Sequence, residues 1–480
     1  MMNLDISISQ YISDVINGEF TSEEFVSQTM DEIKRRDDTL HAYVHIYDDI
    51  INHAKKINRK IQSGTAGKCL GLPISIKDNI CVQNNPVTCG SKILKDYIAP
   101  YDATVISRLK NEDATLVGGP NMDEFAMGIT TEFSAYGPSK NPWNIDCVPG
   151  GSSGGCAVAV SANMCLASLG SDTGGSVRNP ASFCSIVGYK PTYGLISRFG
   201  LVSYANSIEQ IGPMTRTVDD TAFLLEIISG HDSNDNTTIG FESENYLDGI
   251  DLGVEGKKFG IINNDSSLKF DKEVESATSE AVSGLENMGA ISSDVNIDML
   301  KYSVAAYYTI TSTEAASNLA RFDNIRYGYD FDSRGFEFNS YISQARKQFG
   351  PEVTRRMILG GFVPSAGHAG KYFLKALKVK TALIQETEQI FKDVDFLISP
   401  TVPILPFRIG AKIDNPIALF SIDLTTVLAN LSGCPAISVP FALSADSLPI
   451  GIQIMAPHGK DKSLLCAAKA LEKISKVNKS

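Results

Sequence analysis

Hydrophobic residues near the start of the chain recur at the spacing of helices. Thr21 and Glu24 stand three positions apart and fit a capping box, in which Thr21 begins a helix. The apolar residues that follow keep roughly helical intervals as far as residue 33. Apolar residues on one face predict a second helix from about residue 48 to 61. The pattern therefore predicts an N-terminal helical segment over residues 1–65.

The hydrophobic pattern changes at Leu70. Leu72, Ile74 and Ile76 alternate with other residues, which predicts a short strand that ends at the polar run Lys77-Asp78-Asn79. Further strands are predicted at 115–117, 165–169, 395–399, 436–439 and 450–455, and helices at 154–163 and 463–477. Strands that alternate with helices indicate an α/β layered fold.

The length of the chain, 480 residues, corresponds to about three domains of ordinary size. The strand signals after residue 395 nevertheless look like a continuation of the same sheet, and the sequence contains no internal repeat and no linker rich in Gly, Pro or Ser. A polar, acidic segment at 231–256 is interpreted as an exposed loop rather than a domain boundary. We therefore expect one domain over residues 1–480.

Composition and charge exclude several classes of protein. A hydrophobic content of 43% is too high for a disordered chain, and a net charge of −12 argues against nucleic-acid binding as the main surface property. The N-terminus lacks the features of a signal or transit peptide, and the longest apolar stretch, 156–170, is interrupted by polar residues. Nine cysteines without a Cys-x-x-Cys pair predict reduced thiols in a cytoplasmic protein, and six histidines without HExxH make a zinc site an unfavoured interpretation.

Two clusters of glycine and serine stand out from this background, at 149–155 and 170–178. Glycine permits positive φ and close approach to the backbone, so glycine-dense turns expose consecutive N–H groups. Such groups bind anions or oxyanions. The two clusters are separated by one predicted helix and one predicted strand, which makes two merely structural turns a less attractive interpretation.

Three chemical interpretations of these clusters compete. A phosphate-binding loop needs a lysine that neither cluster has. A nucleophile elbow matches the first cluster twice, with Ser152 or Ser153 at its centre, but lacks a preceding strand and a histidine in a motif-like context. The third is a serine activated by a neutral lysine, which requires burial to lower the lysine pKa. Lys77 suits that role, although a lysine is usually a solvated surface charge and Lys77 lies 75 positions before Ser152.

These residues closely resemble the amidase signature family. That family combines a lysine after a strand, a Gly-Gly-Ser-Ser-Gly-Gly turn and a Gly-x-Asp-x-Gly-Gly-Ser-x-Arg-x-Pro segment, which stand here as Lys77, 150–155 and 170–180. The resemblance implies a large mixed central β-sheet covered by helices on both faces, with the signature core in residues 70–220. Within the family, stretches at 121–128, 314–323 and 352–360 are most similar to the glutaminase subunits of tRNA-dependent amidotransferases.

The resemblance also implies roles for individual residues. Ser176 would be the nucleophile, and Ser152 would relay its proton to Lys77 through a cis peptide bond. The backbone N–H groups of Thr173, Gly174, Gly175 and Ser176 would form the oxyanion hole. Ser153 and Asp172 would support the cluster by hydrogen bonds. Met127, Arg356 and Asp423 would bind the substrate, with Arg356 on the glutamine α-carboxylate and Asp423 on its α-ammonium group; the adjacent Arg355 could be confused with Arg356.

The function implied by the resemblance is glutamine hydrolysis within an amidotransferase heterotrimer, whose other members are the B and C subunits. The released ammonia would pass to the B subunit, which uses ATP and magnesium to amidate misacylated Glu-tRNA(Gln). No cofactor or metal is expected in this chain itself. Two alternatives remain at this point, a stand-alone amidase acting on another small amide and a catalytically silent scaffold protein.

Overall fold

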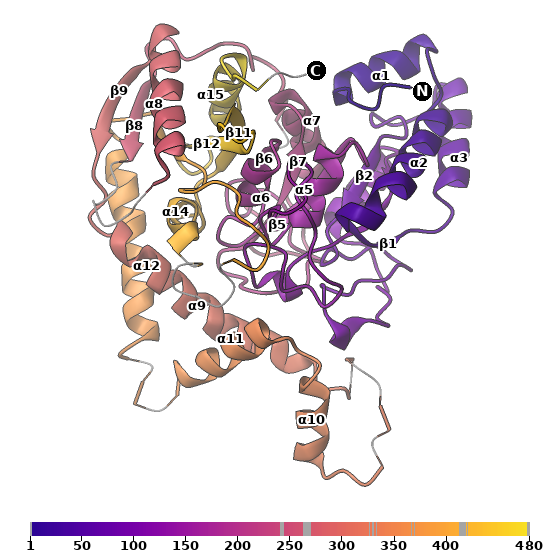
Figure 1. Cartoon of the computed structure of the whole chain (residues 1–480), viewed down its shortest axis with the longest axis vertical. Helices are drawn as coiled ribbons and strands as arrows, with labels where there is room; N and C mark the ends of the chain where they lie inside the picture. Colours follow the sequence, from indigo (N-terminus) through magenta and orange to yellow (C-terminus); the bar gives the residue numbers. More distant parts are fainter. Residues whose placement is uncertain are drawn as a thin grey trace.

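A ten-stranded mixed sheet runs through the molecule, in the order β3-β2-β5-β7-β6-β11-β12-β10-β8-β9 (Figure 1). The structure is a computed structural model that describes residues 2–240, 244–262, 270–325, 327–328, 331–332, 334–365, 367–368, 370–411, 419 and 421–477. The strands of the sheet are β2 Pro73–Ile76, β3 Thr115–Leu116, β5 Ala167–Asp172, β6 Val187–Lys190, β7 Gln210–Thr215, β8 Lys258–Ile262, β9 Ile291–Val295, β10 Phe396–Pro400, β11 Ala436–Leu443 and β12 Pro449–Met455. A separate two-stranded sheet pairs β1 Tyr43–Ile46 with β4 Gly118–Pro120.

The two edges of the large sheet are parallel and its centre is antiparallel. Strand β2 pairs in parallel with β3 and β5, and β8 pairs in parallel with β9 and β10. Between these edges, β7, β6, β11 and β12 pair antiparallel. The expected mixed sheet is therefore confirmed. Strands β10 to β12 belong to the same sheet as β2 and β5, as the alternating pattern after residue 395 predicted.

Helices cover both faces of the sheet. Successive residues of a strand point to opposite faces. Phe396 and Ile398 accordingly join the apolar cluster that contains α7, α8 and α15, whereas Leu397 joins the cluster that contains α9, α12 and α14. The helices are α1 Ile8–Asn17, α2 Ser22–Leu40, α3 Ile50–Gln62, α4 Thr104–Asn111, α5 Gly154–Ser161, α6 Arg178–Phe183, α7 Val218–Ile228, α8 Lys272–Asn287, α9 Ser303–Asn318, α10 Phe338–Arg346, α11 Pro351–Phe362, α12 Phe373–Ile390, α14 Val427–Ser432 and α15 Asp461–Lys473.

The N-terminal helices form as their sequence predicts. The Thr21 hydroxyl accepts the Glu24 N–H at 3.2 Å, and the Glu24 carboxylate accepts the Thr21 N–H at 2.8 Å, which completes the capping box of α2. The predicted helix at 48–61 is α3. The strand predicted at 165–169 begins two residues later and continues to Asp172, so its end reaches the second glycine–serine cluster.

Two regions differ from the simplest interpretation of the sequence. The segment 231–256 has no helix or strand in its described residues, but Tyr246, Ile250 and Val254 anchor it in the core, so it is not simply an exposed loop. Helices α9 to α12 lie together beside the sheet, and α10 lies at the far end of this group (Figure 1). Helix α9 packs against both α11 and α12, and it carries aromatic side chains toward the second glycine–serine cluster.

Candidate active site

Lys77 stands directly after strand β2, which positions its side chain under both glycine–serine clusters. Its N–H donates to the Leu169 carbonyl of the neighbouring strand β5 at 2.9 Å. Its ammonium nitrogen lies 2.8 Å from Ser152 Oγ and 2.9 Å from Ser171 Oγ. The side chain is fully buried, and this burial lowers the lysine pKa to about 8. The sequence-based requirement for a buried lysine near a serine is met.

The first cluster forms the turn before helix α5. The peptide bond between Gly151 and Ser152 is cis. Gly151 packs so closely that an added Cβ would come 2.2 Å from Asp123 Oδ2, which explains glycine at this position. The Asp123 N–H donates to the Ser152 carbonyl at 3.2 Å, and the Ser153 hydroxyl donates to the Ser171 carbonyl at 3.2 Å. Ser153 therefore joins the two clusters by hydrogen bonds.

Ser176 lies between strand β5 and helix α6. Its carbonyl accepts the Ser153 N–H at 3.1 Å, which brings the first cluster beside the second. Ser176 keeps 5% of its surface exposed. Within the described part of the chain, its hydroxyl makes no hydrogen bond. The structure thus joins Lys77 to Ser152 directly, whereas the step from Ser152 to Ser176 stays a prediction.

The glycines of the second cluster form a loop that no larger residue could adopt. Gly175 has φ of +132°, a conformation that L side chains rarely take. A Cβ on Gly174 would come 2.5 Å from the Tyr307 ring, and one on Gly175 would come 2.4 Å from Thr426 Oγ1. The Gly175 N–H donates to Asp172 Oδ1 at 2.9 Å. Of the predicted oxyanion donors, Gly175 is therefore already paired, while no acceptor among the described residues meets the N–H groups of Gly174 and Ser176.

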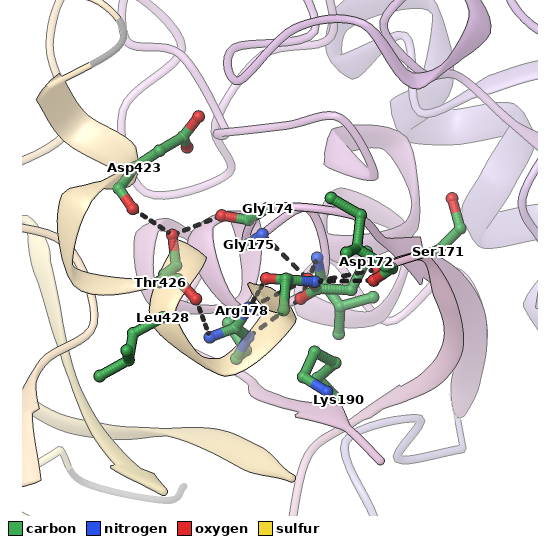
Figure 2. A network of polar contacts seen from close by, with 12 residues as sticks. Ser171, Asp172, Gly174, Gly175, Arg178, Lys190, Asp423, Thr426 and Leu428 are labelled. Carbon is green, nitrogen blue, oxygen red and sulfur yellow. Dashed lines mark hydrogen bonds and ion pairs between the residues drawn. The ribbon is translucent and has the colours of Figure 1, made fainter. Parts of the chain in front are cut away.

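A fully buried ion pair anchors this loop (Figure 2). The Arg178 guanidinium donates to both oxygens of Asp172 at 3.0 Å each. Burial opposes ionisation of Asp172, but the charge and hydrogen bonds of Arg178 outweigh it and hold the carboxyl pKa at about 2. Arg178 also donates to Asn430 Oδ1 at 2.7 Å and Gln453 Oε1 at 2.6 Å, so the loop is tied to α14 and β12. Asp172 is thus linked through Arg178 to α14 and β12, and its supporting role in catalysis stays a prediction.

Arg356 and Asp423, 67 positions apart, meet around Tyr308. The Arg356 guanidinium carbon lies 4.9 Å from the centre of the Tyr308 ring. The Tyr308 hydroxyl donates to Asp423 Oδ2 at 2.9 Å. Asp423 is buried, and this burial raises its carboxyl pKa to about 7. A cation and a carboxyl group therefore lie together near the second cluster, a charge arrangement that suits a zwitterionic substrate.

The two neighbouring arginines are clearly distinguished by their surroundings. Arg356 is 3% exposed, its Nε donates to Glu352 Oε1 at 2.6 Å, and it also donates to the Tyr204 hydroxyl. The Arg355 side chain is 40% exposed and pairs with the same carboxylate of Glu352. Met127 is fully buried in the apolar cluster that contains Tyr307 and Tyr308. Contact of Met127 with a substrate stays a prediction.

Four residues of this site were not identified from the sequence: Ser171, Tyr204, Tyr308 and Thr426. Ser171 lies within the second glycine–serine cluster, and only the neighbouring residues of that cluster indicated a functional site. The two tyrosines and the threonine stand in stretches without a distinctive motif, so their roles depend on contacts between distant segments.

Other features of the described residues bear on the class of protein. No cluster of three or more His, Cys, Asp or Glu side chains in the described part of the chain has a geometry for a metal ion. All nine cysteines are free thiols. Among the helices that the structure describes, none combines the length and apolar character needed to cross a membrane.

Comparisons with known proteins agree with this geometry. The model of the Amidase family matches residues 24–465. The A subunit of glutamyl-tRNA(Gln) amidotransferase from Cenarchaeum symbiosum is 56% identical over 472 residues, which is 98% of each chain. An A subunit of the same enzyme from Clostridium acetobutylicum, numbered 2 in that organism, is 45% identical over 98% of this chain and 99% of the relative.

Solved structures show the same architecture. The crystal structure of the A subunit of glutamyl-tRNA(Gln) amidotransferase from Thermotoga maritima is 38% identical, with a TM-score of 0.82 over 100% of this chain and 97% of that one. A 6-aminohexanoate cyclic dimer hydrolase complexed with substrate is 26% identical, with a TM-score of 0.85 over 99% of this chain and 98% of that one. The family match and the two close relatives, together with the buried lysine beside two glycine–serine turns, establish that the chain belongs to the amidase signature family.

Proposed function

We propose that this chain is the glutaminase component of a tRNA-dependent amidotransferase. It hydrolyses glutamine and supplies the ammonia that converts Glu-tRNA(Gln) to Gln-tRNA(Gln). The observation that carries the proposal is the buried contact of Lys77 with Ser152, in a chain that also brings Arg356 and Asp423 together around Tyr308. The names of relatives 56% and 45% identical over nearly the whole chain support the same function.

The first half of the reaction transfers an acyl group to Ser176. Its hydroxyl oxygen attacks the γ-carbonyl carbon of glutamine, and its proton passes through Ser152 to the neutral Lys77. Backbone N–H groups of the loop stabilise the negative oxygen of the tetrahedral intermediate; loss of one such donor typically costs about 100- to 1,000-fold in turnover. The C–N bond then breaks, and the proton returns from Lys77 through Ser152 to the departing ammonia.

The second half of the reaction releases glutamate. Water attacks the γ-glutamyl ester on Ser176 and gives its proton to Lys77 by the same relay. The ester C–O bond breaks, and the proton returns to the oxygen of Ser176. A lysine whose pKa is lowered to about 8 suits both directions, because a group that titrates near the working pH accepts and donates protons readily.

The substrate is fixed by its two charges. Arg356 binds the α-carboxylate of glutamine, since a guanidinium matches a carboxylate in shape and charge. Asp423 binds the α-ammonium group, and Met127 lies in the apolar cluster beside this site. A neutral amide lacks both charges and would gain nothing from this pair.

The remaining steps belong to partner chains in the proposed assembly. The B and C subunits of the amidotransferase complete a heterotrimer, in which the B subunit binds ATP, magnesium and most of the misacylated tRNA. A net charge of −12 suits a chain that leaves tRNA contact to a partner. Nine free thiols suit a cytoplasmic location.

The test is ammonia release from glutamine by the assembled complex, with and without charged tRNA. We expect hydrolysis of glutamine and a much lower rate on an apolar amide of similar size. A chain that binds neither partner and prefers the apolar amide would instead be a stand-alone amidase. A complex that makes Gln-tRNA only from added ammonium salt would contain a silent scaffold in this position.

A further inference from the structure

Thr426 is a buried residue whose three polar groups each hold a different part of the site (Figure 2). Its hydroxyl donates to the Gly174 carbonyl at 2.6 Å. Its N–H donates to the Asp423 carbonyl at 3.0 Å. Its own carbonyl accepts a hydrogen bond from Arg178 at 3.0 Å. One residue, 1% exposed, thus touches the glycine loop, the carboxyl residue and the anchoring arginine.

The hydroxyl of Thr426 restrains one end of the Gly174–Gly175 peptide unit. The carbonyl of Gly174 and the N–H of Gly175 belong to the same planar peptide group. Thr426 holds its carbonyl end and Asp172 holds its N–H end at 2.9 Å. Because both residues are glycine, side-chain sterics do not define this plane. The two hydrogen bonds therefore hold the plane of the peptide that connects the two peptide units carrying the N–H groups of Gly174 and Ser176.

The same threonine also fixes the backbone of Asp423. The Asp423 carbonyl lies 3.0 Å from the Thr426 nitrogen and 3.0 Å from its hydroxyl oxygen. A hydroxyl has one proton to donate, and the shorter contact is to Gly174, so the N–H serves Asp423 and the hydroxyl serves the loop. Thr426 thus connects the backbone of Asp423 directly to Gly174 through two hydrogen bonds.

We infer that Thr426 is a positioning residue that holds the loop of oxyanion donors in register with Asp423, the residue that binds the substrate α-ammonium group. The inference rests on the proposed glutaminase function. Thr426 acts by keeping the Gly174–Gly175 peptide at a fixed place relative to Asp423. Thr426 thereby links the site that binds the α-ammonium group of glutamine to the N–H groups that bind its γ-carbonyl oxygen.

The test compares Thr426→Val with Thr426→Ser in the assembled complex. Valine keeps the shape of threonine and removes the hydroxyl, whereas serine keeps the hydroxyl. We expect Thr426→Val to lower kcat about 10- to 100-fold, because a small misplacement of catalytic groups is costly. Thr426→Ser should stay within about threefold of the wild type, because its bond to Gly174 is kept. Thr426→Ala replaces the valine variant if that variant does not fold.

A neighbouring residue provides the matched control. The Thr425 hydroxyl donates to the Thr401 carbonyl at 2.7 Å, a buried bond of the same kind that reaches neither Gly174 nor Asp423. Thr425→Val should lower the melting temperature as Thr426→Val does, yet keep kcat within about twofold, because it removes an equivalent hydrogen bond away from the loop.

A double-mutant cycle measures whether Thr426 and Asp423 act together, which a purely structural role of Thr426 would not require. The combined loss in Asp423→Asn, Thr426→Val should fall short of the product of the single losses by at least about threefold, because coupled residues are not additive. The inference is overturned if Thr426→Val and Thr426→Ala keep wild-type kcat, if Thr425→Val loses as much, or if the losses simply multiply. If the wild-type complex does not hydrolyse glutamine, the proposed function itself is overturned, and the inference with it. If the wild type is active and the Thr426 variants are equally active, only the inference is overturned.

Discussion

The ammonium nitrogen of Lys77 lies 2.8 Å from the hydroxyl oxygen of Ser152, although 75 positions separate the two residues in the sequence. Lys77 directly follows strand β2, and Ser152 lies in the turn before helix α5. Both are fully buried, and burial disfavours the charged form of the lysine. A lysine with a lowered pKa and a serine hydroxyl thus meet in the interior of the molecule.

The first prediction concerns the pH dependence of kcat/KM, which reports groups of the free enzyme. Burial lowers the pKa of Lys77 to about 8, so the neutral, basic form is present above pH 8 and is lost below it. We expect kcat/KM for glutamine to increase with pH, with the midpoint of the increase near pH 8. Lys77→Met should abolish hydrolysis at every pH. An activity that is flat from pH 6 to 9 would show that Lys77 is not the base.

A second limb of the same profile should come from Asp423. Burial raises its pKa to about 7, so below pH 7 the carboxyl group is protonated and pairs poorly with an ammonium group. KM for glutamine should therefore rise as the pH falls below 7. Asp423→Asn should have a high KM without this dependence, and should keep the limb near pH 8 because Lys77 is unchanged.

Tyr308 offers a sharper form of the same measurement. Its hydroxyl hydrogen bond favours the charged form of Asp423 and so lowers the carboxyl pKa against the effect of burial. Tyr308→Phe removes that bond and keeps the ring under Arg356. In this variant, the pH below which KM for glutamine rises should therefore be higher than in the wild type. An unmoved limb would indicate that Asp423 does not bind the ammonium group.

Arg356 and Arg355 provide a matched pair of variants. Arg356 is buried against Tyr308, whereas the Arg355 side chain is 40% exposed. Arg356→Ala should raise KM for glutamine about 10- to 100-fold, since a hydrogen bond to a charged group contributes about 1.5–3 kcal/mol. Arg355→Ala should change KM less than about fivefold, because an exposed ion pair contributes at most about 1 kcal/mol. Equal effects, or the reverse order, would reassign the carboxylate-binding residue.

The ion pair of Asp172 and Arg178 should dominate local stability. Arg178→Met leaves a buried carboxylate without its partner, which typically costs about 3–5 kcal/mol. The variant should unfold at a lower urea concentration than the wild type at pH 7. Asp172 has its pKa lowered to about 2, so its stabilising contribution is present above pH 4 and is lost as the pH falls toward 2. The difference between the two proteins should therefore shrink in acid; a constant difference would contradict this account.

Local patterns predicted the elements that depend on neighbouring residues. The capping box at Thr21 and the alternation that ends at Lys77 both correspond to observed elements, because each rests on contacts within a few positions. The approach of Lys77 to Ser152 could be expected only from family resemblance, since spacing alone carries no distance across 75 residues.

The contacts that sequence patterns could not provide are those between distant segments. Tyr308 meets Asp423 across 115 positions and Thr426 meets Gly174 across 252. Each pair depends on how α9 and α14 pack beside the sheet, and a lone tyrosine or threonine has no local pattern that marks it. Gly175 shows the same limit, because its N–H, predicted as an oxyanion donor, donates to Asp172 in the structure.

Trapping the acyl intermediate would show whether Ser176 is the nucleophile of a glutaminase. The assembled complex is quenched in acid during turnover of glutamine, digested, and examined by mass spectrometry. We expect a γ-glutamyl group on the peptide of the second cluster, attached at Ser176. It should be absent from Ser176→Ala, which should fold and assemble normally without releasing ammonia. A γ-glutamyl group on another residue, or ammonia release by Ser176→Ala at the wild-type rate, would contradict the assignment of Ser176 as the nucleophile.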